Sequence, residues 1–239
     1  MYEFRSRIGF SEADENGYLK LEALLDYFQD CSTFHGEDSA MGVRAMEERG
    51  QVWVLSSWQI VVSRYPRMGE RVVIGTAPHG FKGFFGYRNY LLSTEEGEQL
   101  ACANTIWTLM DLKKGCPVRA DQLMLDVYTL EPPLEMEYAP RKITPAEGHR
   151  EQKAPIVITH SHLDMNHHVN NGQYVRMAME YLPDRSKVYQ MRTEYKKETV
   201  LGEVLYPVCC QEESGVFQVE FQDAGGEIRC IVACYSITE

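Results

Sequence analysis

Two stretches of the chain place apolar residues at the spacing of an amphipathic helix. Leu21, Leu24, Leu25 and Phe28 lie at positions i, i+3, i+4 and i+7. The same spacing recurs much later, in Val175, Ala178, Met179 and Leu182. Because residues at this spacing share one side of a helix, the pattern predicts a long helix in each half, with an apolar face turned toward a core.

Each helical stretch is followed by four segments rich in β-branched and aromatic residues, which are typical of strands. The first set covers residues 52–65, 71–77, 84–92 and 99–111, and the second covers 187–197, 203–210, 216–221 and 227–237. Turn signals match between the sets: residues 68–70 correspond to 201–203, and 95–97 correspond to 224–226. Such short turns join neighbouring antiparallel strands. Each half therefore predicts an antiparallel meander whose apolar face is covered by the helix.

The two halves also share a polar loop ahead of the helix. Ser11, Asp14 and Asn16 recur 150 residues later as Ser161, Asp164 and Asn166, which indicates an internal repeat. The sequence thus predicts a duplicated α+β protein, with an N-terminal domain over residues 1–128 and a C-terminal domain over residues 156–239. The intervening residues 129–155 contain five prolines and several charges, and they are predicted to be a linker that follows the surface.

Composition narrows the classes of protein that fit. Of 239 residues, 44% are hydrophobic and 25% are charged, which suits a chain that is globular throughout. The formal net charge of −11 disfavours nucleic acid or an anionic membrane as the main partner, because neither is drawn to a negative field. The sequence has no membrane-length apolar run and no signal-peptide pattern at the N-terminus. Seven cysteines without a CxxC pair indicate buried thiols rather than a disulfide framework, so we expect a cytoplasmic protein.

Candidate chemistry lies in the second polar loop, where residues 163–175 read LDMNHHVNNGQYV. An aspartate and an asparagine before a helix are ordinary capping residues, and this is our interpretation of the first copy. Two ionisable side chains occur only in the second copy. His168 replaces Tyr18, and Glu198 replaces Tyr65 in the corresponding strand. The difference between the copies predicts a functional site in the C-terminal half.

Two motifs then resemble a known family. LDMNHHVNN (residues 163–171) and EYKKET (residues 194–199) resemble the motifs of plant and bacterial acyl-acyl carrier protein thioesterases, and SRYPRMGERVVI and NTIWTLMDL extend the likeness to the first half. The resemblance implies a double (tandem) hot-dog fold, in which each of two antiparallel sheets wraps around a long central helix. It also implies hydrolysis of fatty acyl thioesters on acyl carrier protein, terminating fatty acid synthesis, without a cofactor.

Residue-by-residue carry-over implies a catalytic group made of Asp164, Asn166, His168 and Glu198. The family's cysteine after the glutamate is Thr199 here, so a cysteine nucleophile at that position is excluded. Glu194, at the start of the second motif, is expected to be a solvated strand residue.

Thioester hydrolysis depends mainly on activating water, because a thiolate, whose ordinary pKa is near 8.5, leaves with little help. A histidine titrates near neutral pH, so His168 and Glu198 are expected to position and deprotonate the water. Asn166 would fix the orientation of the water through amide hydrogen bonds. Asp164 either holds this array or attacks the carbonyl itself.

The second helix is expected to begin near Asn170 or Asn171, where its unpaired N–H groups and its dipole favour the developing oxyanion. The chain has no GxSxG nucleophile elbow, which argues against an α/β-hydrolase. The histidines around the loop are not accompanied by cysteines at ligand spacing, so no metal site is expected.

The acyl chain would need an apolar tunnel, and the resemblance points to the N-terminal half as its binding domain. The candidates for its wall, each of which also suits an ordinary core, are Phe28, Met41, Met46, Trp53, Leu55 and Trp58. The expected partner is acyl carrier protein bearing an acyl-phosphopantetheine, and a homodimer is left open. Two alternatives also stay open: an acyl-coenzyme A thioesterase of the same fold, and a non-catalytic acyl-binding module.

Overall fold

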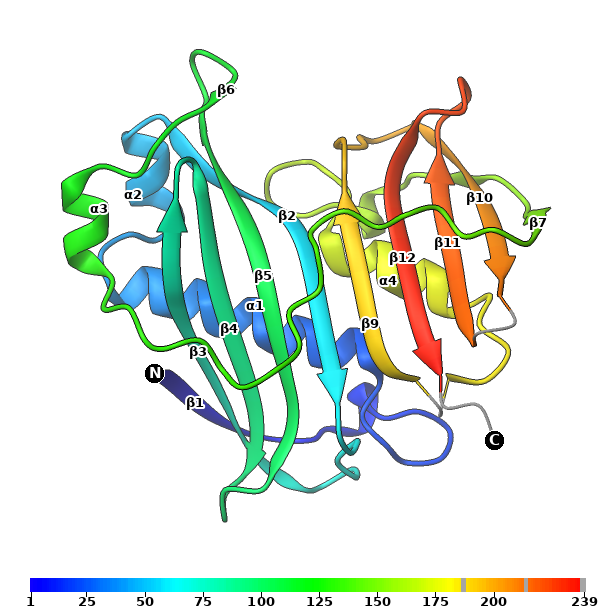
Figure 1. The fold of residues 1–239 in the computed structure, drawn as a ribbon, viewed down its shortest axis with the longest axis horizontal. Helices are drawn as coiled ribbons and strands as arrows, with labels where there is room; N and C mark the ends of the chain where they lie inside the picture. The colour runs from blue at the N-terminus through cyan, green and yellow to red at the C-terminus, as the bar shows by residue number, and fades with distance from the viewer. Residues whose placement is uncertain (186–187, 213–214, 237–239) are drawn as a thin grey trace. The chain divides into compact units, whose positions relative to one another are not determined.

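The computed structural model describes residues 1–185, 188–212 and 215–236, and the chain forms two compact units (Figure 1). The first unit comprises Met1–Ser56 and Ile60–Tyr138, and the second comprises Ser57–Gln59 and the chain from Ala139 onward. The main division therefore falls inside the stretch predicted to be a linker. Two predicted strand ends, Lys187 and Ile237, lie outside the described residues.

The first unit is a helix packed on a sheet of antiparallel neighbours. The sheet order is β1-β3-β4-β5-β2, and a short strand, β6, pairs with β5. The helices are α1 (Leu21–Asp38), α2 (Val43–Glu48) and α3 (Gln122–Val127), and a 3-10 turn covers Phe10–Glu12. The strands are β1 (Tyr2–Arg7), β2 (Gln51–Val62), β3 (Arg71–Lys82), β4 (Phe85–Thr94), β5 (Gln99–Asp111) and β6 (Cys116–Pro117).

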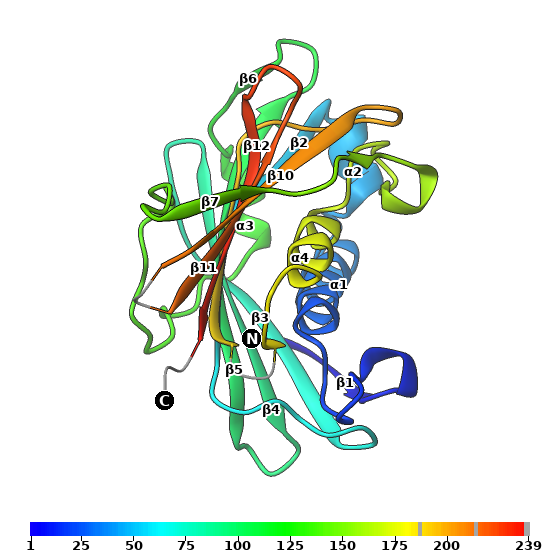
Figure 2. The ribbon, with the colours of Figure 1, turned by 90° about the vertical axis from the view of Figure 1, so that its right-hand side faces the viewer.

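The predicted apolar face of α1 is confirmed. Leu21, Leu24, Leu25 and Phe28 are all buried, and Figure 2 shows α1 lying along one face of the sheet of its unit. β1 was not predicted, because its side chains alternate between partly buried and exposed positions at the sheet edge and carry no strong apolar period.

The second unit repeats this arrangement with the sheet order β9-β12-β11-β10-β7, and β8 also pairs with β10. Its elements are β7 (His149–Gln152), β8 (Ile156–Val157), α4 (Asn171–Met179), β9 (Val188–Tyr195), β10 (Val204–Gln211), β11 (Val216–Gln222) and β12 (Ile228–Ser236). The order β2-β5-β4-β3 of the first unit thus corresponds to β9-β12-β11-β10. The duplication inferred from the sequence is confirmed.

The second helix is shorter than its apolar pattern predicted. α4 ends at Met179, whereas Leu182, the last member of the pattern, lies beyond the helix although it is still buried. The next residue is Pro183, and a proline disfavours helical conformation in the residue before it.

The cysteine side chains are mostly buried. All seven cysteines are free, and only Cys116 is exposed. Burial raises the pKa of Cys31 to about 12 and that of Cys209 to about 11, so these thiols are held in the protonated form.

Over the described residues, no helix is both long enough and apolar enough to cross a lipid bilayer.

Candidate active site

The polar loop that carries the first motif is held together by Asp164. The N–H of Asp164 donates to the carbonyl of His168 (2.8 Å), and the N–H of His167 donates to the carbonyl of Asp164 (3.1 Å). Its side-chain Oδ1 accepts hydrogen bonds from the N–H groups of Asn166 (2.8 Å) and His168 (3.3 Å). The carboxylate therefore fixes the shape of the loop through backbone contacts.

The loop lies against the segment that follows β9, and this contact brings the two ionisable side chains together. The N–H of Val169 donates to the carbonyl of Thr199 (2.9 Å), and His168 forms an isolated β-bridge with Val200. As a result, His168 Nε2 lies 3.5 Å from Glu198 Oε2, with the two side chains 39% and 67% exposed. The expected proximity of His168 and Glu198 is present, and both groups are accessible to a substrate.

The other two members of the carried-over group are placed differently. Asn166 is exposed, and its N–H is bound by Asp164. In the part of the chain that the structure describes, the Asp164 carboxylate contacts the loop backbone, and no ion pair joins it to the imidazole of His168. The structure thus places His168 beside Glu198, whereas the Asp164 carboxylate stabilises the loop through its backbone N–H groups.

The first copy shows which part of this geometry is inherited. Asp14 Oδ1 accepts the N–H groups of Asn16 and Tyr18, both at 2.9 Å, and the N–H of Leu19 donates to the carbonyl of Pro66 (2.9 Å). These contacts match those of Asp164 and Val169. In the first copy, however, the tyrosine ring lies under the guanidinium of Arg67, 5.0 Å from its centre. The loop is a shared scaffold, and only the second copy uses it to present an imidazole beside a carboxylate.

The start of α4 lies where the sequence predicted it. Asn170 is the N-cap residue, and its side chain accepts a hydrogen bond from the N–H of Gly172 (2.8 Å). Its carbonyl accepts the N–H of Gln173 (2.9 Å), and Asn171 is the first helical residue. Asn170 therefore satisfies two of the first N–H groups, which limits the helix donors that an oxyanion can use.

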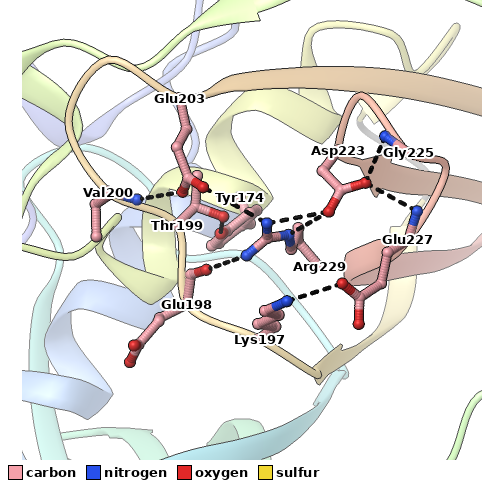
Figure 3. Close-up of polar contacts among 10 residues, drawn as sticks. All are labelled: Tyr174, Lys197, Glu198, Thr199, Val200, Glu203, Asp223, Gly225, Glu227 and Arg229. Carbon is pink, nitrogen blue, oxygen red and sulfur yellow. Dashed lines mark hydrogen bonds and ion pairs between the residues drawn. The ribbon is translucent and has the colours of Figure 1, made fainter.

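Thr199, which stands in place of the family's cysteine, is a buried structural residue. Its hydroxyl accepts a hydrogen bond from the hydroxyl of Tyr174 (2.8 Å), and burial raises the pKa of that tyrosine. Tyr174 in turn packs edge-on against Phe221, with ring centres 5.5 Å apart. Figure 3 shows Thr199 directed toward Tyr174, while the Glu198 carboxylate points away from it. Consecutive residues of an extended segment face opposite sides, so Thr199 faces the core.

Two charged residues of this region differ from what the sequence suggested. Glu194 was expected to be solvated, and this was wrong: the residue is 4% exposed and accepts a hydrogen bond from the N–H of Ile143 (3.0 Å). Arg229 was not singled out, yet it is buried and its Nη1 donates to the main-chain carbonyl of Glu198. The signal that could have found it is a lone arginine inside the apolar run IRCIVAC.

The six candidates for the acyl-binding wall are buried or partly buried. Met41 and Met46 belong to a cluster with Leu109, Met124 and Tyr128, against which Trp53 packs. Phe28, Leu55 and Trp58 are also buried. Trp58, however, groups with the second unit, where its main-chain N–H donates to Thr193 Oγ1 (3.2 Å).

A pocket opens beside the candidate site, and it is lined by apolar residues such as Val204 and Leu205 as well as by polar ones. Thr199, Glu203, Tyr206, Asp223 and Arg229 are among its wall residues. Among the described residues, no group of three or more His, Cys, Asp or Glu is arranged to hold a metal ion.

The fold and the paired loops are those of a double hot-dog protein, and the sequence comparisons give the family. Residues 1–128 match the model for the acyl-ACP thioesterase N-terminal domain, and residues 147–233 match the model for the acyl-ACP thioesterase C-terminal domain. The chain therefore belongs to the acyl-ACP thioesterase family.

Relatives with curated names are plant proteins. One is the chloroplastic palmitoyl-acyl carrier protein thioesterase of Cuphea hookeriana, which is 25% identical over 232 residues, covering 87% of this chain and 55% of the relative. Another is oleoyl-acyl carrier protein thioesterase 1 of Arabidopsis thaliana, which is 23% identical over 219 residues, covering 81% of this chain and 59% of the relative. This chain spans just over half the length of these relatives.

Solved structures share the fold over nearly the whole chain. An acyl-ACP thioesterase from Bacteroides thetaiotaomicron superposes with a TM-score of 0.89 at 22% identity, covering 98% of this chain and 96% of that one. A 12:0-ACP thioesterase from Umbellularia californica superposes with a TM-score of 0.84 at 18% identity, covering 100% and 98% of the two chains.

Proposed function

We propose that the protein hydrolyses the thioester of fatty acyl-acyl carrier protein to a free fatty acid and holo-carrier protein, terminating fatty acid synthesis. The observation that carries the proposal is the pairing of His168 Nε2 with Glu198 Oε2 at 3.5 Å, accessible from solvent, in a member of the acyl-ACP thioesterase family. A carboxylate beside an imidazole stabilises the imidazolium that forms when the imidazole accepts a proton.

In the proposed reaction, His168 removes a proton from a water molecule while the water oxygen attacks the thioester carbonyl carbon. The electron pair of the carbonyl moves to its oxygen, and the N–H of Asn171 at the start of α4 contributes to stabilising that oxyanion. When the carbonyl re-forms, the C–S bond breaks. The leaving thiolate then takes the proton from His168, which returns the site to its starting state.

We infer that Asp164 holds the loop and does not attack the substrate. Its Oδ1 is already engaged by two backbone N–H groups, and Asp14 makes the same contacts in the first copy, which has no histidine at the corresponding position. The exposed amide of Asn166 is proposed to orient the attacking water.

The remaining assignments are proposals that rest on family membership. The N-terminal unit would bind the acyl chain and the C-terminal unit would carry the catalytic residues, with acyl carrier protein as the partner and the cytoplasm as the location. The named relatives act on palmitoyl- and oleoyl-carrier protein, which supports a fatty acyl chain as the substrate class.

The test is turnover of a panel of acyl-carrier protein and acyl-coenzyme A thioesters of varied chain length. His168→Ala and Glu198→Ala are each expected to lower kcat by at least about 100-fold, the usual contribution of a general base. The matched control is Tyr65→Ala, at the position of the first copy that corresponds to Glu198, which should leave kcat unchanged. Preference for coenzyme A would make the protein an acyl-coenzyme A thioesterase, and the absence of thiol release from every thioester would indicate a binding module.

A single turnover in ¹⁸O-labelled water tests whether Asp164 attacks to form a mixed anhydride that water then opens at the Asp164 carboxyl carbon. Direct attack by water places ¹⁸O in the fatty acid released in the first turnover. An unlabelled product, with the label found in Asp164 instead, would mean that the carboxylate attacks the substrate.

A further inference from the structure

Arg229, near the start of β12, contacts the segment that carries Glu198 from its buried side. Its side chain is 10% exposed, and its Nη1 donates to the main-chain carbonyl of Glu198 (2.7 Å). The rest of the guanidinium faces two carboxylates, with Asp223 Oδ2 3.1 Å from Nε and Glu203 Oε1 3.5 Å from Nη2. Figure 3 shows the guanidinium enclosed by these three groups.

The main chain of Arg229 holds the same segment at a second point. Its carbonyl accepts hydrogen bonds from the N–H groups of Lys196 (2.9 Å) and Lys197 (3.2 Å). These residues follow the last residue of β9, Tyr195, so the segment has left the strand where Arg229 binds it. One residue therefore fixes three consecutive residues, of which the third is Glu198.

Asp223 is in turn fixed by the turn that joins β11 to β12. Its Oδ1 accepts the N–H groups of Gly225 (2.9 Å) and Glu227 (3.0 Å). These hydrogen bonds, with that from Arg229, lower the pKa of Asp223. The carboxylate is thus ionised and held in place, with its second oxygen directed at the arginine.

The first copy contains the same backbone frame, with uncharged residues at the positions of Arg229 and Asp223. The carbonyl of Leu100 accepts the N–H groups of Ser63 (2.9 Å) and Arg64 (3.1 Å), as the carbonyl of Arg229 does for Lys196 and Lys197. Thr94 occupies the turn position of Asp223, and its hydroxyl accepts the N–H of Glu98 (3.2 Å). Leu100 is fully buried. A leucine and a threonine at these two positions are therefore compatible with the same backbone hydrogen bonds, and the ion pairs of the first copy come instead from Arg64, which contacts Glu70 and Glu98.

The second copy has an arginine and an aspartate where the first has apolar and neutral residues, and this difference needs a local reason. Removing two charges from water has a desolvation cost, and apolar replacements of buried ion pairs are often neutral or stabilising. Stability of the sheet therefore does not account for the pair. Arg229 and Asp223 occur in the copy that has Glu198 beside His168.

We propose that Arg229, oriented by Asp223, is a positioning residue that sets the place of the Glu198 carboxylate relative to His168. The proposal rests on the proposed function of that pair. The Glu198 side chain is largely exposed. The hydrogen bond from Arg229 to the main-chain carbonyl of Glu198 is therefore a main restraint on the position of the Glu198 backbone, from which the side chain extends. A displacement of about 1 Å in a catalytic group can cost about 100-fold in rate.

The experiment replaces the pair by the residues of the first copy, in the double variant Asp223→Thr/Arg229→Leu, and also uses the single variant Arg229→Gln. Gln is too short to reach the Glu198 carbonyl and Asp223 together. With the best acyl-carrier protein substrate, kcat is expected to fall about 10- to 100-fold, while KM changes by less than about two-fold because the substrate contacts are unaltered. Thermal unfolding identifies the variants that are folded. The matched control is Arg64→Leu. It breaks the ion pair of the first copy between Arg64 and Glu70 (2.9 Å), the residue that corresponds to Glu203, and should leave kcat unchanged.

Each folded variant is then combined with Glu198→Ala. Because Arg229 acts through Glu198, its replacement is expected to lower kcat by less than about two-fold further in the Glu198→Ala background. Losses that multiply independently, or a wild-type kcat in a folded Arg229 variant, would overturn the proposal. If Glu198→Ala alone leaves turnover unchanged, the proposed function of the His168–Glu198 pair is what fails.

Discussion

At the residue scale, one position of the polar loop has the same left-handed backbone in both copies but is occupied by different residues. His167 has a φ of 62°, in the left-handed region, and the corresponding residue of the first copy is Gly17, with a φ of 79°. A residue with a Cβ is disfavoured in this region, whereas glycine adopts it readily. The second loop therefore holds His167 in a conformation that is better suited to the residue of the first.

His167→Gly is expected to raise the free energy of unfolding by about 0.5–1 kcal/mol. The left-handed conformation costs about 1–2 kcal/mol for a residue with a Cβ, and the greater chain entropy of glycine offsets about 0.5–1 kcal/mol of that gain. Urea unfolding at pH 7 measures the difference. The reverse control is Gly17→Ala, where a Cβ would meet no other atom within 4 Å, so only the backbone conformation is tested. That variant should lose stability, and a gain would contradict the explanation.

The residue scale also shows how far the site was predictable. His168 and Glu198 were identified because they are the ionisable differences between two copies of one pattern, and comparing the copies needs no tertiary information. Glu194 and Arg229 were misjudged or missed, because a charged residue in a strand looks the same in sequence whether it faces solvent or a buried partner.

At the scale of elements, α3 shows how one side chain stabilises a short helix. Asp121 is its N-cap residue, and its Oδ1 accepts the N–H of Met124 (3.0 Å). Its other oxygen pairs with Arg49. The hydrogen bond from Met124, with the charge of Arg49, holds the pKa of Asp121 below its ordinary value of 3.8.

Asp121→Ala is expected to lower the free energy of unfolding by about 0.5–2 kcal/mol at pH 7, the usual contribution of an N-cap. A lowered pKa in the folded state means that stabilisation by the carboxylate is fully present above pH 3.8 and is lost as the pH falls through the lower folded value. The difference from wild type should therefore shrink below about pH 4. Denaturant titrations at pH 7 and pH 3 would check this, and a constant difference would refute the role of the carboxylate.

At the scale of the whole molecule, the predicted linker is held by buried polar side chains of each unit. In the first unit, Asn89 accepts the N–H of Leu134 (3.0 Å). In the second unit, Glu194 accepts the N–H of Ile143 (3.0 Å), and Gln218 accepts the N–H of Ala146 (2.8 Å). The buried acceptors satisfy backbone groups that would otherwise be unpaired, so the segment is a strap fixed to the sheets.

Gln218→Leu tests the strap. The glutamine also donates to the carbonyl of Thr144 (2.9 Å), so leucine leaves two backbone groups without partners, each costing about 1–3 kcal/mol if it stays buried. We expect faster cleavage by a protease within residues 139–155 and a lower free energy of unfolding. Gln211→Leu is the matched control, because Gln211 is exposed, and it should change the free energy by no more than about 0.5 kcal/mol. Equal cleavage of both variants would contradict this explanation.

The sequence by itself determined the helical face of α1, most of the strands and the duplication, because the apolar period, the strand composition and the turn glycines are properties of short segments. It also determined which copy carries the ionisable residues. Only the tertiary structure decided that His168 and Glu198 lie 3.5 Å apart, that Thr199 faces the core and that Arg229 is buried behind the site. These facts depend on how segments about 30 residues apart pair and which face each strand turns inward, and local patterns do not specify that pairing.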